Sequence, residues 1–155
     1  MSDEVSLRDV TEADLETFYE QQLDPEAADL ANFPSRDRET FMNHWTTRVL
    51  GDPANLLRAV SVDGATAGNI VAWWEEDRRF IGYWFGRAWW GRGIGTAALA
   101  LFLAEERTRP LYADPFEGNA GSVRLLEKTG FRRDGVITHG GKTHLLFVLD
   151  PPIGN

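Results

Sequence analysis

The sequence predicts one α/β (α+β) domain with a central mixed, mostly antiparallel sheet flanked by helices. The chain has 155 residues, the usual length of one domain, and no linker, repeat or low-complexity segment divides residues 1–155. Its 43% hydrophobic and 26% charged residues are typical of a soluble globule. Several strand-like segments follow one another through short turns, which distinguishes the pattern from a regular alternation of strands and helices.

The amino-terminal third predicts one strand and two helices. Thr11 is followed three positions later by Asp14, the spacing of a capping box at a helix start. Phe41, Trp45 and Val49 recur at helical spacing and predict a buried face, so core packing is the expected role of Trp45. The expected elements are a strand over 5–8, a helix that starts after Thr11, an irregular stretch over 24–37 and a helix over 38–50.

The remainder predicts strands joined by tight turns, with two further helices. Asp63-Gly64 is a strong hairpin signal, and the acidic run at 75–77 separates the next two strands. Gly130 stands where a glycine commonly ends a helix. Strands are expected over 56–62, 67–74, 80–85, 111–113, 131–138 and 143–149, and helices over 96–107 and 119–129.

Charge and cysteine content exclude several classes of function. With 24 acidic and 16 basic residues the net charge is −8, which disfavours nucleic acid and is compatible with a cationic acceptor such as an amine. The absence of cysteine excludes disulfides, thiolate nucleophiles and cysteine-ligated metals. We find no signal pattern and no apolar run of ~18 residues, so a cytoplasmic protein without a membrane partner is expected. A homodimer is compatible with the sequence.

The most informative segment is the glycine-rich turn Trp89-Trp90-Gly91-Arg92-Gly93-Ile94-Gly95-Thr96, between an expected strand and a helix. A helix amino terminus attracts phosphate, and glycines let the anion approach the backbone N–H groups. A turn that merely needs positive φ angles is the alternative. A Walker loop would need Gly-Lys-Ser/Thr, and a dinucleotide fingerprint would need glycine in place of Thr96. Asp114 lies about where the ribose-binding acid would fall, but the hairpins before the turn argue against that fingerprint.

Together with a second segment, this turn resembles the GNAT superfamily of acetyl-CoA-dependent N-acetyltransferases. The superfamily's pyrophosphate loop reads Gln/Arg-x-x-Gly-x-Gly/Ala, and residues 90–95 fit it with Trp90 in place of Gln or Arg. The second segment is Asn119-Ala120-Gly121-Ser122-Val123-Arg124-Leu125-Leu126-Glu127-Lys128-Thr129-Gly130-Phe131. With Ile81-Gly82-Tyr83-Trp84, it is similar to the RimJ/RimL-like branch, which modifies ribosomal-protein amino termini.

The resemblance implies a site for acetyl-CoA and no metal. The backbone of Tyr83, Trp84 and Phe85 is expected to pair with the pantetheine arm as an added strand. Asn119 and Ser122 are expected near the pantetheine or thiol end, and Asn119 also suits a helix N-cap. The pyrophosphate is expected on backbone N–H groups of Gly91, Arg92, Gly93, Ile94, Gly95 and Thr96.

The resemblance also implies direct attack of a primary amine through a tetrahedral intermediate, with an oxyanion donor near Phe85. Many members carry a tyrosine, as general acid, where this chain has Leu126, so Ser122 is the first substitute and Tyr83 the second. The related branch often carries a glutamate where this chain has Phe80. Glu75 is the base candidate that we prefer, and water relay remains open. The other base candidates are Glu76, Asp77, His139 and His144, of which the histidines are expected on a hairpin surface without metal-ligand spacing.

The acceptor stays open among an amino-terminal peptide, a polyamine, an aminoglycoside and a small amino compound. Residues 23–37 are expected to form part of its wall, with Phe33, Trp73 and Trp74 as lining. Because both usual catalytic residues are missing, a non-catalytic acyl-CoA-binding module is the competing hypothesis. A nicotinamide-dependent oxidoreductase is the more distant one.

Overall fold

The structure, a computed structural model, describes residues 4–152 and has one seven-stranded sheet in the order β1-β2-β3-β4-β5-β7-β6. All neighbouring strands pair antiparallel except β4 and β5, which are parallel, so the expected mixed, mostly antiparallel sheet is confirmed. The strands are β1 Val5–Arg8, β2 Leu56–Val62, β3 Ala65–Glu75, β4 Arg78–Phe85, β5 Leu111–Ala113, β6 Arg132–His139 and β7 Lys142–Leu149.

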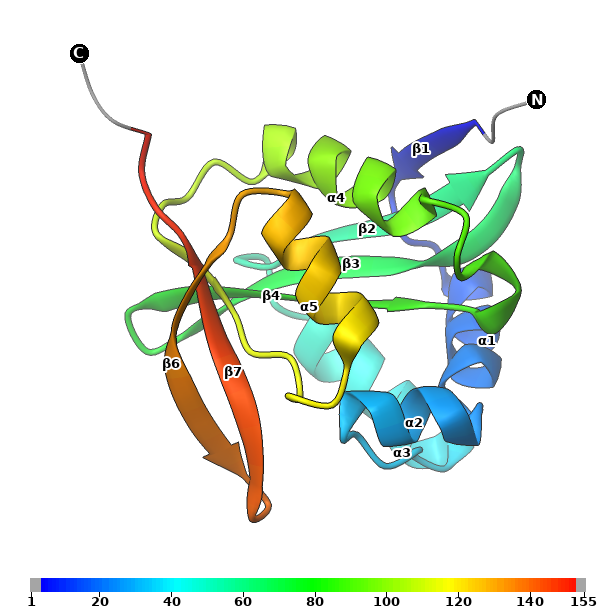
Figure 1. Cartoon of the computed structure of the whole chain (residues 1–155). Coiled ribbons are helices and arrows are strands. Elements are labelled where there is room, and N and C mark those ends of the chain that lie inside the picture. Colours follow the sequence, from blue (N-terminus) through cyan, green and yellow to red (C-terminus); the bar gives the residue numbers. More distant parts are fainter. Residues whose placement is uncertain (1–3, 153–155) are drawn as a thin grey trace.

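Helices cover both faces of this sheet. They are α1 Glu12–Gln22, α2 Pro25–Ala31, α3 Arg38–His44, α4 Ile94–Glu105 and α5 Ala120–Lys128, with a short 3₁₀ turn η2 Arg87–Trp89. Figure 1 shows α4 and α5 across the front of the sheet, α1, α2 and α3 gathered at its lower right, and the β6–β7 hairpin extending away from the rest. Within residues 4–152, no helix is long and apolar enough to cross a membrane.

Alternation along the strands divides the core into two layers. On β2, Val60 and Val62 belong to the cluster that packs under α4 and α5, whereas Ala59 belongs to the cluster under α1 and α3. Leu99 and Phe102 of α4 are fully buried in the first cluster, together with Leu126 of α5. Phe18, Phe41 and Trp45 belong to the second, so the expected core role of Trp45 is confirmed.

The expectation of an irregular stretch over 24–37 is wrong in its first half, where α2 forms. Asp24 caps this helix by accepting a hydrogen bond from the Glu26 N–H at 3.1 Å. Pro25 takes the first helical position, where the missing N–H costs nothing. The pair of signals that starts a helix was therefore present, and the two prolines of the stretch masked it.

The single helix expected over 38–50 is also wrong, because α3 ends at His44 and a π-helical segment η1, Trp45–Val49, follows. The Leu50 N–H reaches the Trp45 carbonyl at 2.7 Å, one residue further back than in an α-helix. Hydroxyls compete for the carbonyls of the preceding turn: Thr47 donates to Asn43 at 2.6 Å. The wider turn keeps Trp45 and Val49 buried.

The fold opens a gap between β4 and β5. These strands pair only at Arg79 with Leu111 and Phe80 with Tyr112. A buried ion pair between Arg79 and Glu106, 2.8 Å apart, closes the paired end. Beyond Phe80 the strands diverge, while β4 stays paired to β3 as far as Phe85.

Candidate active site

The divergence leaves one edge of β4 open over residues 81–85. In an antiparallel pair, every second residue directs its backbone N–H and C=O away from the partner strand. The backbone groups that alternate away from β3 along this stretch therefore face the gap instead of β5. An extended ligand with amide groups can pair with such an edge as an added strand.

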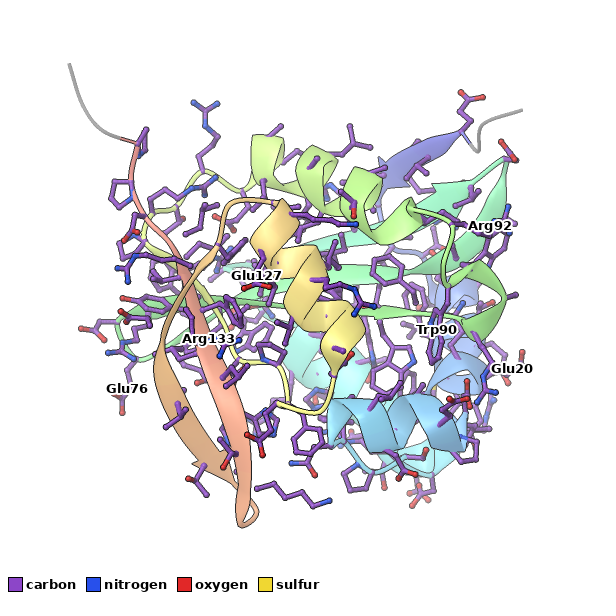
Figure 2. The ribbon with its side chains drawn as sticks, viewed as in Figure 1. Glu20, Glu76, Trp90, Arg92, Glu127 and Arg133 are labelled. Atoms are coloured by element: carbon purple, nitrogen blue, oxygen red, sulfur yellow. The ribbon has the colours of Figure 1, made fainter. Side chains whose placement is uncertain are left out.

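The glycine-rich turn lies next to this edge and starts α4. Gly91 and Gly93 have φ angles of 72° and 75°, a region that other residues rarely adopt. Gly93 is the N-cap of α4 and offers no side-chain cap, so the first N–H groups of this twelve-residue helix have no such partner. In Figure 2, Trp90 and Arg92 lie at the right, where α4 starts. The Arg92 guanidinium stacks over the Trp89 ring at 5.1 Å. The turn thus has the form of an anion site.

The structure brings two predicted catalytic side chains into contact. The Tyr83 hydroxyl on β4 and the Ser122 hydroxyl on α5 form a hydrogen bond of 2.5 Å. Burial raises the pKa of the Tyr83 hydroxyl well above its usual range, and the bond to Ser122 opposes this rise only in part. The tyrosine therefore stays protonated and can donate to the Ser122 oxygen, which leaves the serine hydroxyl free to donate into the gap.

The start of α5 holds Ser122 in place. Asn119 is the N-cap, as expected, and its Oδ1 accepts a hydrogen bond from the Ser122 N–H at 3.1 Å. Leu126, one turn further along, is fully buried. The first turn of α5 thus directs Asn119 and Ser122 toward a pocket that the inner part of the helix supports by packing.

A pocket of ≈ 810 Å³ continues from these residues across the sheet. Asn119, Ser122, Tyr83 and Trp84 line it, whereas the glycine-rich turn lies outside its lining. Aromatic rings give it much of its wall: Phe33 packs edge-on against Trp84 at 6.3 Å. The other aromatic lining residues are Phe18, Phe41, Trp45, Trp73, Trp74 and Phe116, so Phe33, Trp73 and Trp74 lie where we expected them.

An array of one carboxylate and two imidazoles lies in the same pocket. Asp114, at the end of β5, accepts a hydrogen bond from His139 Nε2 at 2.8 Å. His144 Nδ1 donates to the Asp114 backbone oxygen at 2.7 Å, and Asn32 Nδ2 donates to His144 Nε2 at 2.9 Å. His144 is buried, so the expectation of a surface position is wrong for it but holds for exposed His139.

This array also corrects the expectation that the histidines are dispersed. One ligand atom each of Asp114, His139 and His144 lies within 4.8 Å of the other two. Two imidazoles and a carboxylate can ligate a divalent cation. Here they bond to one another and to Asn32, and His144 has both ring nitrogens engaged. The arrangement favours a hydrogen-bonded array that can bind or accept a proton from an amine.

The acidic run at 75–77 contributes one residue to the pocket. Glu75 ends β3, lines the pocket and accepts a hydrogen bond from Trp73 Nε1 at 3.2 Å. Glu76, with a φ of 55°, stands at the outer turn of the β3–β4 hairpin, and Figure 2 shows it on the side opposite Trp90. Glu75 therefore stays a base candidate, whereas Glu76 points to the solvated turn.

Asp114 is the pocket residue that the sequence did not single out for this role. The sequence suggested Asp114 only as the ribose-binding acid of a dinucleotide site, an interpretation against which the preceding hairpins argued. A stronger signal was available: β5 is a short, buried strand beside the parallel neighbour β4, and polar side chains at the carboxyl ends of parallel strands often line ligand clefts.

A splayed sheet edge, a glycine turn at a helix start and a serine on the next helix together resemble the donor site of acyltransferases that use acyl-CoA. A match to a known family identifies the family of acyltransferases to which the chain belongs. The model of the Acetyltransferase (GNAT) domain matches residues 4–132. The chain therefore belongs to the GNAT acetyltransferase family, and the expectation of an acetyl-CoA-dependent N-acyltransferase is confirmed.

Relatives and solved structures agree with this membership. Aminoglycoside N(6')-acetyltransferase type 1 of Klebsiella pneumoniae is 27% identical over 161 residues, which cover 88% of this chain and 78% of the relative. The structure of AAC(6')-Ib in complex with ribostamycin and coenzyme A superposes with a TM-score of 0.79 at 22% identity, covering 96% of this chain and 94% of that one. Mycobacterium smegmatis RimJ in complex with CoA-disulfide gives a TM-score of 0.75 at 22% identity over 93% and 80%.

Proposed function

We propose that this acetyltransferase moves the acetyl group of acetyl-CoA to the primary amine of a small acceptor bound in the pocket. One observation carries the proposal: the Tyr83–Ser122 pair joins the open edge of β4 to a pocket of ≈ 810 Å³. This volume is in the range of small-molecule sites. The pair thus stands where a thioester held along β4 would meet an amine held in the pocket.

The donor is held by backbone groups on this proposal. The open β4 edge at Tyr83, Trp84 and Phe85 takes the pantetheine arm. The N–H groups from Gly91 to Thr96, at the positive end of the α4 dipole, take the pyrophosphate, and Arg92 adds charge at the rim. Asn119 and Ser122 lie at the thiol end.

The amine must lose a proton before it attacks, because an alkyl ammonium with a pKa of ~10 has no lone pair at neutral pH. Asp114 is our first candidate for the group that receives the ammonium, since His139 forms a hydrogen bond to one of its carboxylate oxygens. Its carboxylate receives the ammonium, and His139, which is exposed, connects it to solvent. Glu75 is the second candidate for the same task.

The amine then attacks the thioester carbonyl, and a backbone N–H near Phe85 stabilises the oxyanion. As the intermediate collapses, the C–S bond breaks and Ser122 donates a hydrogen bond to the departing sulfur. Tyr83 donates a hydrogen bond to Ser122 in turn, which orients the serine hydroxyl while the tyrosine keeps its own proton. The proton that the attacking nitrogen loses balances the proton on the released thiol.

The relatives direct the choice of acceptors to be tried. Aminoglycosides are the first group, since aminoglycoside acetyltransferases stand among the relatives. An amino-terminal peptide is the second, because Ile81-Gly82-Tyr83-Trp84 and the segment at 119–131 resemble the RimJ/RimL-like branch.

The test is release of free CoA thiol from acetyl-CoA with a panel of amines that includes ribostamycin, kanamycin, polyamines, amino acids and short peptides. We expect sustained release with at least one group. A thermal melt in parallel should show stabilisation by acetyl-CoA and CoA, and not by NADH or ATP. Ligand at ~100 times its Kd adds ~2.7 kcal/mol to the free energy of unfolding. A melt unchanged by millimolar CoA would contradict the donor site, and donor binding without turnover would contradict the transfer.

A further inference from the structure

Among the residues that the structure describes, one wall of the pocket carries basic side chains that have no carboxylate partner. Arg36, His44 and Arg48 all line it, from the segment after α2, the end of α3 and η1. Within residues 4–152, no carboxylate lies within ion-pair distance of the Arg36 or Arg48 guanidinium. Other arginines do pair with carboxylates, among them Arg8, Arg38, Arg58, Arg79, Arg87 and Arg132.

The backbone of Arg36 is fixed by a buried side chain. Gln22, only 5% exposed, accepts a hydrogen bond from the Arg36 N–H at 2.7 Å and donates to the Arg36 carbonyl at 3.0 Å. Ser35 adds a bond to the Gln22 carbonyl at 2.6 Å. At the other end of the segment, Asn32 is held by His144 across the pocket. The segment that carries Arg36 is therefore pinned to both α1 and β7.

The guanidinium itself is held by an aromatic ring and not by an ion pair. It stacks over Phe33 at 4.8 Å, and Phe33 packs on Trp84. Stacking leaves the edge of the guanidinium, with its N–H donors, free to bind an anion. Arg36 is thus positioned before any ligand binds, which lowers the entropic cost of binding.

The surroundings of Arg36 and His44 are unfavourable for positive charge when no anion is present. Burial lowers the pKa of Arg36, and burial followed by the charges of Arg36 and Arg48 lowers the pKa of His44. A carboxylate of Asp52 also lines the pocket, but its Oδ1 accepts from the Ala54 N–H at 2.9 Å, and it pairs with neither guanidinium. A ligand carboxylate would offset this unpaired charge.

We propose that Arg36, assisted by Arg48, binds a carboxylate of the acceptor, so that the acceptor is an amino acid or a peptide-like amine that carries both charges. The inference rests on the proposed function. Asp114 receives the ammonium end and Arg36 the carboxylate end. A purely polycationic acceptor would leave Arg36 and Arg48 facing like charge, which costs affinity.

Matched pairs of amines test this selectivity. The pairs are 4-aminobutyrate with butylamine, L-lysine with cadaverine, and the dipeptide Ala-Ala with its amide. We expect the carboxylate member of at least one pair to have a kcat/KM at least tenfold higher. The Ala-Ala pair separates a peptide acceptor from a free amino acid.

A substitution at Arg36 tests whether this residue causes the preference for an acceptor that carries a carboxylate. Arg36→Met keeps the backbone bonds to Gln22 and should lower kcat/KM for the preferred carboxylate amine about 10- to 100-fold, mostly through KM. The rate with the partner that lacks the carboxylate should not fall. Arg38→Met is the matched control, since Arg38 lies outside the pocket and pairs with Glu16. It should change neither rate.

Equal rates for both members of every pair, or an equal loss for both in Arg36→Met, would overturn the inference while leaving the proposed function intact. Calorimetric titration of the same pairs into the CoA complex measures the preference without turnover. Failure of every amine to release thiol would instead contradict the proposed function, and the titration would still decide whether Arg36 binds a carboxylate.

Discussion

Removal of the Ser122 hydroxyl should slow the chemical step more than it weakens binding of acetyl-CoA. The thiol of CoA has a pKa of ~8.5, close to neutral, so its departure needs only modest assistance. A single positioned donor should therefore contribute roughly 10²-fold, at the low end for acid–base groups. We expect Ser122→Ala to lower kcat by about that factor with little change in the acetyl-CoA KM, measured by steady-state thiol release with the best amine.

The contact with Tyr83 makes the effect of a second variant calculable. Tyr83→Phe removes the 2.5 Å hydrogen bond but leaves the serine hydroxyl in place. One neutral hydrogen bond contributes about 0.5–1.5 kcal/mol, so kcat should fall by no more than roughly tenfold. The double variant should be hardly slower than Ser122→Ala alone, because the tyrosine acts through the serine.

The pH profile provides an independent measurement on the same variants. Because burial holds the pKa of Tyr83 above its usual range, no loss of activity from its ionisation should appear up to about pH 9.

Full activity in Ser122→Ala would refute the role of the serine and transfer it to Tyr83 or to water. If the variant with both substitutions lost activity by the product of the two single losses, the idea that Tyr83 acts through Ser122 would be refuted.

Three further predictions concern the donor loop, the base and the fold. Gly93→Val should weaken CoA binding more than tenfold in calorimetry, whereas Gly64→Val should not, although both sites have positive φ and open space around an added Cβ. Asp114→Asn should lower kcat/KM about 10²-fold and Glu75→Gln far less, and the opposite order would assign the base to Glu75. The bond from Arg8 lowers the pKa of Asp14 to about 2, so its stabilisation is complete above pH ~4 and lost as pH falls through about 2. Asp14→Asn should remove that dependence and up to about 2 kcal/mol of the free energy of unfolding, measured by denaturation at each pH.

Local signals made most of the fold predictable. Asp63-Gly64 and the acidic run at 75–77 marked the hairpins, and the glycine-rich turn preceded α4, although this helix starts at Ile94 and not at Thr96 as expected. The misassigned segments were those in which two local rules competed. In 24–37 the prolines and polar residues indicated an irregular stretch, although Asp24-Pro25 also suits a helix start. In 38–50 the apolar spacing indicated one helix, although threonine hydroxyls widen the turn.

The acceptor side of the site was less predictable because its contacts join residues far apart in the chain. Asn32 and His144 bond across 112 positions, and Tyr83 and Ser122 across 39. No periodicity or spacing encodes such pairs. The proposed pantetheine edge and pyrophosphate turn, by contrast, lie within one strand and the turn that follows it, so a local sequence pattern was enough to suggest them.

The net charge of the whole chain differs from the charge inside the pocket. An excess of acidic residues suggested a cationic acceptor, yet acidic residues are distributed over the whole chain, and some of them pair with arginines such as Arg8 and Arg132 away from the pocket. The pocket lining includes two guanidiniums without carboxylate partners among the described residues, and a carboxylate that is hydrogen-bonded to an imidazole. A ligand responds to the charges within about a Debye length, ~8 Å at physiological ionic strength, and not to the sum over the chain. On our proposal, the local arrangement therefore selects an acceptor with charges of both signs, even though the protein as a whole is acidic.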